Sequence, residues 1–209
     1  MHIDDETAQV LDALVPHVAF EGWTSRALTL ALTELARDPA EGELIFAGSG
    51  EMIEAYFSLA DSRMIETAQE AGLEAERLTA RVRAVVALRL EQDLGDKEAI
   101  RRALAWLSLP LQAPRLARIM AATTDSIWYA AGDKSADFSW YTKRASLGAV
   151  YVATLLYWLN DTSPGAENTL AFLDRRLAGI GRIGKLRHEI TGRLCNLVPG
   201  RLRQGFTPQ

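Results

Sequence analysis

The side chains that most often carry covalent or acid–base chemistry are few in this sequence. The chain of 209 residues contains one cysteine, Cys195, and three histidines, His2, His17 and His188. Their spacing fits neither a structural zinc site nor a Cys/His nucleophile pair. The sequence also lacks a Gly-x-Ser-x-Gly elbow, a phosphate-binding glycine loop and the Glu-x-x-His repeats that build di-iron sites. We therefore expect no catalytic centre, metal site or other cofactor, and predict that the protein is not an enzyme.

Aromatic side chains gather in one segment and are the residue types that most suggest a binding function. Residues 128–158 contain three of the five tryptophans and four of the five tyrosines. Trp140 and Tyr141 stand beside Lys143 and Arg144 at the expected start of a helix, and exposed Trp, Tyr and Arg side chains are frequent anchors of protein interfaces. We predict that these four residues form a partner-binding surface. Three further aromatic residues on an uncharged part of the same helix are expected in the core: Tyr151, Tyr157 and Trp158.

The C-terminal end contains a second candidate binding element. Residues 182–209 hold six basic side chains and one acidic one, a net charge of +5. Between residues 183 and 197, apolar side chains recur at helical intervals and basic ones occupy the remaining face. Such a helix can lie in the headgroup region of an anionic membrane, although it can also pack on its own bundle. The membrane-binding residues that we predict are Ile183, Lys185, Leu186, Arg187, Ile190, Arg193, Leu194 and Leu197.

The elements that position these residues are predicted to be helices throughout. Apolar side chains repeat with a helical period, and no run alternates like a half-buried strand. We expect three short helices in the first 60 residues, with Pro16 kinking or ending the first and Thr24 capping the second. Longer helices follow, one capped by Asp96, one over residues 139–160 that is apolar nearly all round, and one that begins at Pro164. The predicted fold is all-α, with a degenerate helix-turn-helix followed by a larger helical bundle.

Charge divides the chain into three predicted parts. Residues 1–62 form a helix-turn-helix-like part with a net charge of −10, residues 63–181 form the helical bundle, and residues 182–209 form the basic segment. The longest strongly apolar stretch without a charge has fifteen residues, short of the roughly 20 that a spanning helix needs. The acidic N-terminus does not fit a secretory or transit peptide. We expect a cytoplasmic protein.

The N-terminal part resembles the DNA-binding domain of TetR-type repressors. Gly22, Trp23 and Thr24 open an Ala/Leu-rich helix, and a glycine-containing turn separates it from the next one. DNA binding, however, depends on Lys and Arg side chains that displace counterions from phosphates. Between Arg37 and Arg63 there are six acidic residues and no basic one, so this region would repel a duplex. We expect no nucleic-acid partner, and a TetR-type transcriptional regulator remains the alternative.

Two stretches carry a resemblance to a known family. Residues 127–165, with the runs AGD, WYTKR and SPG, and residues 171–177, AFLDRRL, resemble the lipid-binding accessory family of coenzyme Q (ubiquinone) biosynthesis, the "COQ nine" family and its bacterial homologues. The resemblance implies a TetR-like fold that is usually dimeric, that has lost DNA binding and that holds an isoprenoid lipid in an apolar cavity. It also implies a terminal amphipathic helix that meets the bilayer.

The resemblance further implies a partner and a role. Members of the family present quinone precursors to the demethoxyubiquinone hydroxylase, which docks around the positions of Trp140 and Tyr141. We therefore predict an accessory protein of ubiquinone biosynthesis that takes isoprenoid quinone intermediates from the membrane, acting as a homodimer at the cytoplasmic face of a bacterial inner membrane. A scaffold that binds no lipid is a further possibility.

The lipid cavity is expected among the apolar helix faces of the bundle, which offer more apolar surface than a thin bundle needs. A solid core is the alternative. The lipid-binding residues that we predict are Val82, Val86, Leu90, Ile119, Met120, Ile127, Leu147, Val150, Tyr151 and Leu155.

Overall fold

The computed structural model describes residues 3–133 and 139–179. Within these ranges every regular element is helical, which confirms the all-α prediction. A 3-10 turn at Pro164–Ala166 leads into a last helical segment over residues 167–179. The labelled α-helices are α1 (Asp5–Glu21), α2 (Ser25–Glu34), α3 (Gly42–Ile45), α4 (Ser49–Glu70), α5 (Leu78–Gln92), α6 (Lys97–Leu107), α7 (Ala113–Ala130) and α8 (Ser139–Leu159).

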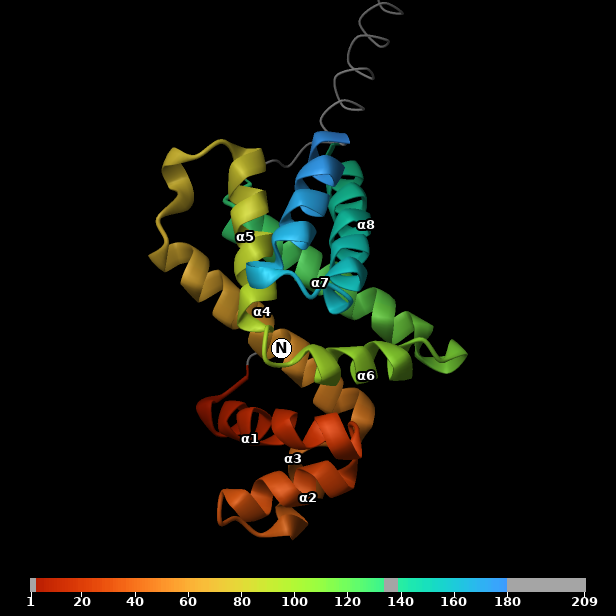
Figure 1. The fold of residues 1–209 in the computed structure, drawn as a ribbon. Coiled ribbons are helices and arrows are strands. Elements are labelled where there is room, and N and C mark those ends of the chain that lie inside the picture. The colour runs from red at the N-terminus through yellow and green to blue at the C-terminus, as the bar shows by residue number, and fades with distance from the viewer. Residues whose placement is uncertain (1–2, 134–138, 180–209) are drawn as a thin grey trace, which may run out of the picture.

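The helices form a small N-terminal module and a larger bundle. Figure 1 shows α1, α2 and α3 together at one end of the molecule and α5, α7 and α8 at the other. The long helix α4 runs from the first group into the second, and α6 crosses between them. Helix α1 packs on α2 and α6, while α4 packs on α5 and α7, and α7 packs on α8. The buried apolar side chains form one continuous cluster across both groups.

The start of α2 confirms the predicted cap, whereas α1 does not end at Pro16, which was one of the two outcomes predicted there. The Thr24 hydroxyl accepts a hydrogen bond from the backbone N–H of Ala27. Helix α1 continues through Pro16 to Glu21 and ends at Gly22, whose φ is 71°. The apolar face of α1 is buried on both sides of the proline, and we attribute the continuity of the helix to that packing, which offsets one lost backbone hydrogen bond.

The third helix of the N-terminal part is not short. Helix α4 contains 22 residues, so residue 62, the predicted end of the N-terminal part, lies inside it. Its buried face includes Ile53 before this position and Met64 after it. The prediction of a short helix rested on the apolar residues from Met52 to Leu59, which lie only in the first turns of this buried face. A single rigid helix therefore contributes to both the N-terminal module and the bundle.

Three polar contacts attach the N-terminal module to the bundle. The indole Nε1 of Trp23 donates to the backbone oxygen of Ala99 on α6 at 2.9 Å. Arg63 of α4 donates two hydrogen bonds to the Asp12 carboxylate on α1, at 2.8 and 2.7 Å. The Tyr56 ring also packs against Trp23, with ring centroids 5.3 Å apart. The module is therefore held by buried contacts as well as by the continuity of α4.

We expect Trp23→Phe to lower the free energy of unfolding by about 1 kcal/mol more than Trp128→Phe does, because only Trp23 loses a hydrogen bond. Both indoles are buried, and the Nε1 of Trp128 has no hydrogen-bond partner among the described residues. Urea unfolding followed by circular dichroism measures both values. Equal losses for the two variants would show that the bond to Ala99 does not hold the module.

Candidate functional site

The ten predicted lipid-binding residues lie on the inward faces of α5, α7 and α8. None of them is more than 9% exposed, and all belong to the continuous core cluster. The bundle thus brings these side chains together as predicted from their periodicity. They pack against one another, and their role in lipid binding stays a prediction.

An apolar recess is lined by residues of α7 and α8 alone. It is a groove of about 650 Å³ between α7 and α8. The stretch of α8 that borders it, from Arg144 to Leu156, is about 18 Å long at the rise of an α-helix. Of the ten predicted residues, only Met120 lines the groove. The lining residues are Met120, Ala121, Thr124, Asp125, Arg144, Ala145, Gly148, Ala149, Val152, Ala153 and Leu156.

Small side chains create this groove, which explains why the sequence analysis missed it. Ala145, Ala149 and Ala153 follow one another at intervals of four residues and so share a face of α8. Gly148 lies where the two helices approach closely, because a Cβ atom at this position would be 3.2 Å from the Thr124 Oγ1. We searched for large apolar residues, and these define the core. The alanine spacing was the signal that identifies a groove.

One end of the groove is polar and lies near the start of α8. Arg144 Nε donates to the Asp125 Oδ1 at 2.6 Å, and Lys143 Nζ lies 3.9 Å from Asp133 Oδ1. These two residues of the predicted partner surface therefore link α8 to the end of α7. Trp140 occupies the first turn of α8, but its side chain and that of Tyr141 fall outside the described part of the chain.

The aromatic residues divide differently from the prediction. Tyr151 and Trp158 are fully buried, as expected. The core assignment of Tyr157 is wrong, since this side chain is 40% exposed. It stacks on Phe172 of the last helical segment, with ring centroids 4.7 Å apart. This position lies on the outer face of α8, which the uniformly apolar sequence of the helix did not reveal.

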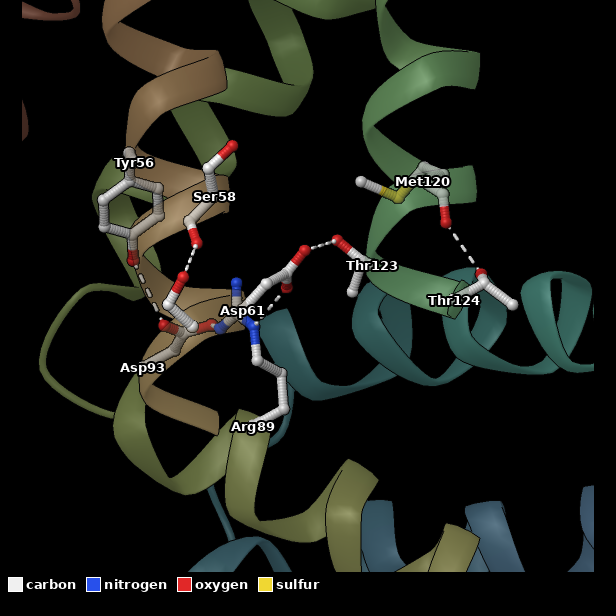
Figure 2. A network of polar contacts seen from close by, with 9 residues as sticks. Tyr56, Ser58, Asp61, Arg89, Asp93, Met120, Thr123 and Thr124 are labelled. Atoms are coloured by element: carbon white, nitrogen blue, oxygen red, sulfur yellow. Dashed lines mark hydrogen bonds and ion pairs between the residues drawn. The ribbon is translucent and has the colours of Figure 1, made fainter. Parts of the chain in front are cut away.

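A cluster of buried charges joins three helices of the bundle. Figure 2 shows the Arg89 side chain extending from α5 between Asp61 of α4 and Asp93 at the end of α5. Arg89 is completely buried, and its Nε donates to Asp61 Oδ1 at 3.3 Å. The Thr123 hydroxyl of α7 donates to the other Asp61 oxygen at 2.8 Å. Tyr56 adds a hydroxyl that donates to Asp93 at 3.2 Å.

The same cluster explains why the side chain of Asp96 does not cap α6. Asp96 occupies the predicted N-cap position of α6, but its side chain makes no capping bond and instead accepts a hydrogen bond from Tyr56 at 3.2 Å. Burial raises the pKa of the Asp61 and Asp93 carboxyls, and the Arg89 cation opposes this shift. The sequence analysis missed this cluster. The i, i+4 spacing of Arg89 and Asp93 beside an apolar stripe was the available signal.

Asp61→Asn is expected to change the pH dependence of stability. Burial raises the pKa of Asp61 to about 6, whereas an unfolded aspartate titrates near 3.9 (roughly). Because the native state holds this proton more tightly, the contribution of Asp61 to stability is greatest below about pH 4 and is lost as the pH rises through about 6. The Tm of the wild type should therefore fall relative to that of Asp61→Asn as the pH rises across this window. A Tm difference that is constant with pH, measured by circular dichroism, would contradict this assignment.

The remaining predictions concern contact with the membrane and metal binding. The membrane-binding residues predicted between residues 183 and 197 lie outside the described residues. Within residues 3–133 and 139–179, we find no helix with the length and apolar content of a membrane-spanning segment, and no group of three or more His, Cys, Asp or Glu side chains arranged to hold a metal ion.

In the N-terminal module, the helix at the position of a DNA-recognition helix is very short. The helix that follows α2 is α3, which has four residues and thus about one turn. Its exposed residues are Glu43 and Leu44, and Leu44 is 88% exposed. A recognition helix enters the major groove and surrounds itself with phosphate contacts from Lys and Arg. The acidic, single-turn α3 does not offer these features.

A comparison with protein families finds a match in the C-terminal half of the chain. Residues 113–184 match the model of the COQ9 family, and this match begins at the first residue of α7 and includes α8 and its groove. This segment is therefore similar to the COQ9 family. The matched segment contains the candidate groove, the polar end near Arg144 and the position of Trp140.

Curated relatives extend this similarity beyond residues 113–184. The chain is 29% identical over 206 residues to the Homo sapiens protein "Ubiquinone biosynthesis protein COQ9, mitochondrial". It is 31% identical over 177 residues to the COQ9-A protein of Xenopus laevis, an alignment that covers 81% of this chain and 56% of that protein. It is 30% identical over 179 residues to the COQ9 protein of Drosophila melanogaster, with 84% of this chain and 55% of that protein covered. The alignment covers 95% of this chain and 65% of the human protein, so the chain spans just under two thirds of that relative. The resemblance seen in the sequence is confirmed.

A solved structure supports the fold of the whole chain. The crystal structure of the TetR transcriptional regulator from Nitrosomonas europaea matches with a TM-score of 0.67 at 23% identity. The match covers 84% of this chain and 97% of the regulator. The predicted TetR-like fold is therefore confirmed. The segment that matches the COQ9 family, residues 113–184, includes α7 and α8 of the bundle.

Proposed function

We propose that this protein acts in ubiquinone biosynthesis as a lipid-binding accessory protein without catalytic activity of its own. The observation that carries the proposal is the COQ9 match over residues 113–184, together with relatives that are named as ubiquinone biosynthesis proteins. In this proposal the protein takes isoprenoid quinone intermediates from the membrane and presents them to the demethoxyubiquinone hydroxylase. It works as a homodimer at the cytoplasmic face of a bacterial inner membrane.

The α7–α8 groove supports the lipid-binding part of the proposal. Its walls are largely apolar, and exposed alanines at 145 and 149 leave room for a chain about as long as the groove. Transfer of each methylene or methyl group of an isoprenoid chain out of water contributes about 0.8 kcal/mol. A prenyl chain along α8 therefore gains enough free energy to remain bound in water.

The proposal includes two further contacts, one with the hydroxylase and one with the membrane. The first involves the start of α8 and the second involves residues beyond 179. The hydroxylase docks on the surface that Trp140, Tyr141, Lys143 and Arg144 define, next to the polar end of the groove. The basic segment, residues 182–209, binds the anionic membrane through its net charge of +5. In this arrangement, the membrane supplies the lipid and the hydroxylase receives it, and both bind to the C-terminal part of the chain.

Lipid extraction from purified protein tests the proposal. We expect prenylated quinone precursors to co-purify with the wild type and their amount to fall about tenfold in Ala149→Trp, because the indole fills the groove and removes burial of at least two methylene groups. Ala117→Trp is the matched control, since Ala117 is an exposed alanine of α7 that does not line the groove. Mass spectrometry of the extract quantifies the lipid.

Two results would contradict the proposal at different points. A wild-type protein without any co-purifying isoprenoid, and without affinity for anionic vesicles, would remove the lipid-binding function. Equal loading of Ala149→Trp and Ala117→Trp would leave lipid binding in place but exclude the groove as its site. The inward residues of α5, α7 and α8, such as Val86 and Leu147, would then be the remaining location.

The alternative function is a TetR-type transcriptional regulator, which the shared fold favours. We expect instead that DNA binding is weak, because the segment between Arg37 and Arg63 contains no Lys or Arg. Without these cations, the release of counterions from DNA phosphates contributes little to affinity. Fluorescence anisotropy with genomic fragments at low and moderate salt measures this. Tight binding with a steep dependence on salt would make the regulator the better assignment.

A further inference from the structure

A small cavity between α4 and α7 has no assigned role. Its volume is about 240 Å³, and its walls combine apolar side chains with ionised ones. A space of this size suits a single substituted ring, because larger ligands occupy larger pockets. The cavity shares no lining residue with the α7–α8 groove. It is therefore a separate candidate site.

Asp61 lines the buried end of this cavity. Its side chain keeps 9% of its exposed area, whereas that of Arg89 keeps none. An ionised carboxylate offers about four acceptor positions. Among the described residues, Asp61 accepts from Arg89 Nε at 3.3 Å and from the Thr123 hydroxyl at 2.8 Å. Asp61 can therefore accept a further hydrogen bond from a ligand in the cavity.

The buried end carries an excess of negative charge. Asp61 and Asp93 share the single guanidinium group of Arg89. A ligand carboxylate placed there would be repelled. A hydroxyl group loses less hydration free energy on burial than an ammonium group does, so a hydroxyl is the donor that this end favours.

The exposed end of the cavity has the opposite charge. The Oε1 atom of Glu54 accepts from Arg115 Nε at 3.0 Å and from Arg118 Nη1 at 3.2 Å. Two cations therefore share one carboxylate, and neither forms another ion pair with the described acidic residues. Arg118 lines the cavity, and its side chain is 69% exposed. This end can bind a carboxylate, for which the planar guanidinium group offers paired donors.

Apolar walls connect the two ends. Glu54 and Asp61 are seven residues apart, which is about 10 Å along α4. Phe57 lies between them on the same face of α4, and Ile119 of α7 also lines the cavity. Such a space fits a flat aromatic ring with a hydroxyl group at one end and a carboxylate at the other.

We propose that this cavity binds a small hydroxyaromatic acid. The ligand hydroxyl donates to Asp61, and the ligand carboxylate pairs with Arg118. The ring lies against Phe57 and Ile119. At 3.6 residues per turn, positions 118, 119 and 122 lie on the opposite side of α7 from positions 120, 121 and 124 of the groove. The inference thus goes beyond the lipid-binding function and does not rest on it.

Isothermal titration calorimetry on the full chain tests the proposal with three probes. They are 4-hydroxybenzoate, 2-hydroxybenzoate, in which the same two groups are adjacent, and benzoate, which has no hydroxyl. We expect 4-hydroxybenzoate to bind about tenfold more tightly than either of the others, because a hydrogen bond to an ionised group is strong and only this probe reaches both ends. This comparison needs no substitution in the buried charge cluster.

Arg118→Gln tests the exposed end. The substitution removes the cation that pairs with the ligand carboxylate, and we expect the affinity for 4-hydroxybenzoate to fall about threefold, as for an exposed ion pair. Arg26→Gln is the matched control, because Arg26 is 77% exposed, forms one ion pair with Glu21 and does not line the cavity. This control should bind as the wild type does.

Three results would overturn the site. Equal affinities of the wild type for 4-hydroxybenzoate and 2-hydroxybenzoate would show that the two ends do not act together. An unchanged affinity in Arg118→Gln would place the ligand elsewhere, and no binding of 4-hydroxybenzoate at millimolar concentration would leave the cavity without this ligand. The lipid-binding proposal is tested separately, by the isoprenoid that co-purifies with the protein.

Discussion

A fully buried guanidinium is the interaction on which the arrangement of the bundle depends. Removing a cation from water is costly, and the cost is offset only when carboxylates and hydrogen bonds meet it at fixed positions. Arg89 of α5 meets Asp61 of α4 and Asp93 at its own helix end, and Thr123 of α7 completes the coordination of Asp61. Three helices must therefore keep one mutual rotation, because any other would leave a charge buried without its partner.

This constraint also determines what the outer surface of the bundle looks like. Once Thr123 faces Asp61, the neighbouring Thr124 faces α8, at the position where Gly148 allows close approach. The alanines of α8 then face outward beside α7 and leave an open groove. The core stays filled by large side chains such as Leu155. A polar cluster inside thus positions an apolar recess outside, and the segment that matches the COQ9 family contains both α7 and α8.

The N-terminal module of this TetR-like fold is attached to the bundle through α4 and α6. Helix α4 extends from this module into the charge cluster, so Tyr56 packs on Trp23 at one point and donates to Asp93 at the other. The indole of Trp23 reaches α6. These contacts attach the module to the domain that holds the groove. Helix α3 is short and carries Glu43 but no Lys or Arg, so it lacks the cations with which a recognition helix contacts DNA phosphates.

The sequence by itself determined the helical class, the cap at Thr24, the charge asymmetry and the relationship to COQ9 proteins, because these depend on local periodicity, composition and short motifs. It also placed the core faces of α5, α7 and α8, since a 3.6-residue repeat identifies a buried stripe. Only the tertiary structure decided that α1 passes through Pro16, that Arg89 pairs with Asp61, and that a groove lies along Ala145 to Leu156. These features depend on how helices rotate against one another, and helical periodicity carries no information about the neighbour that a face will meet.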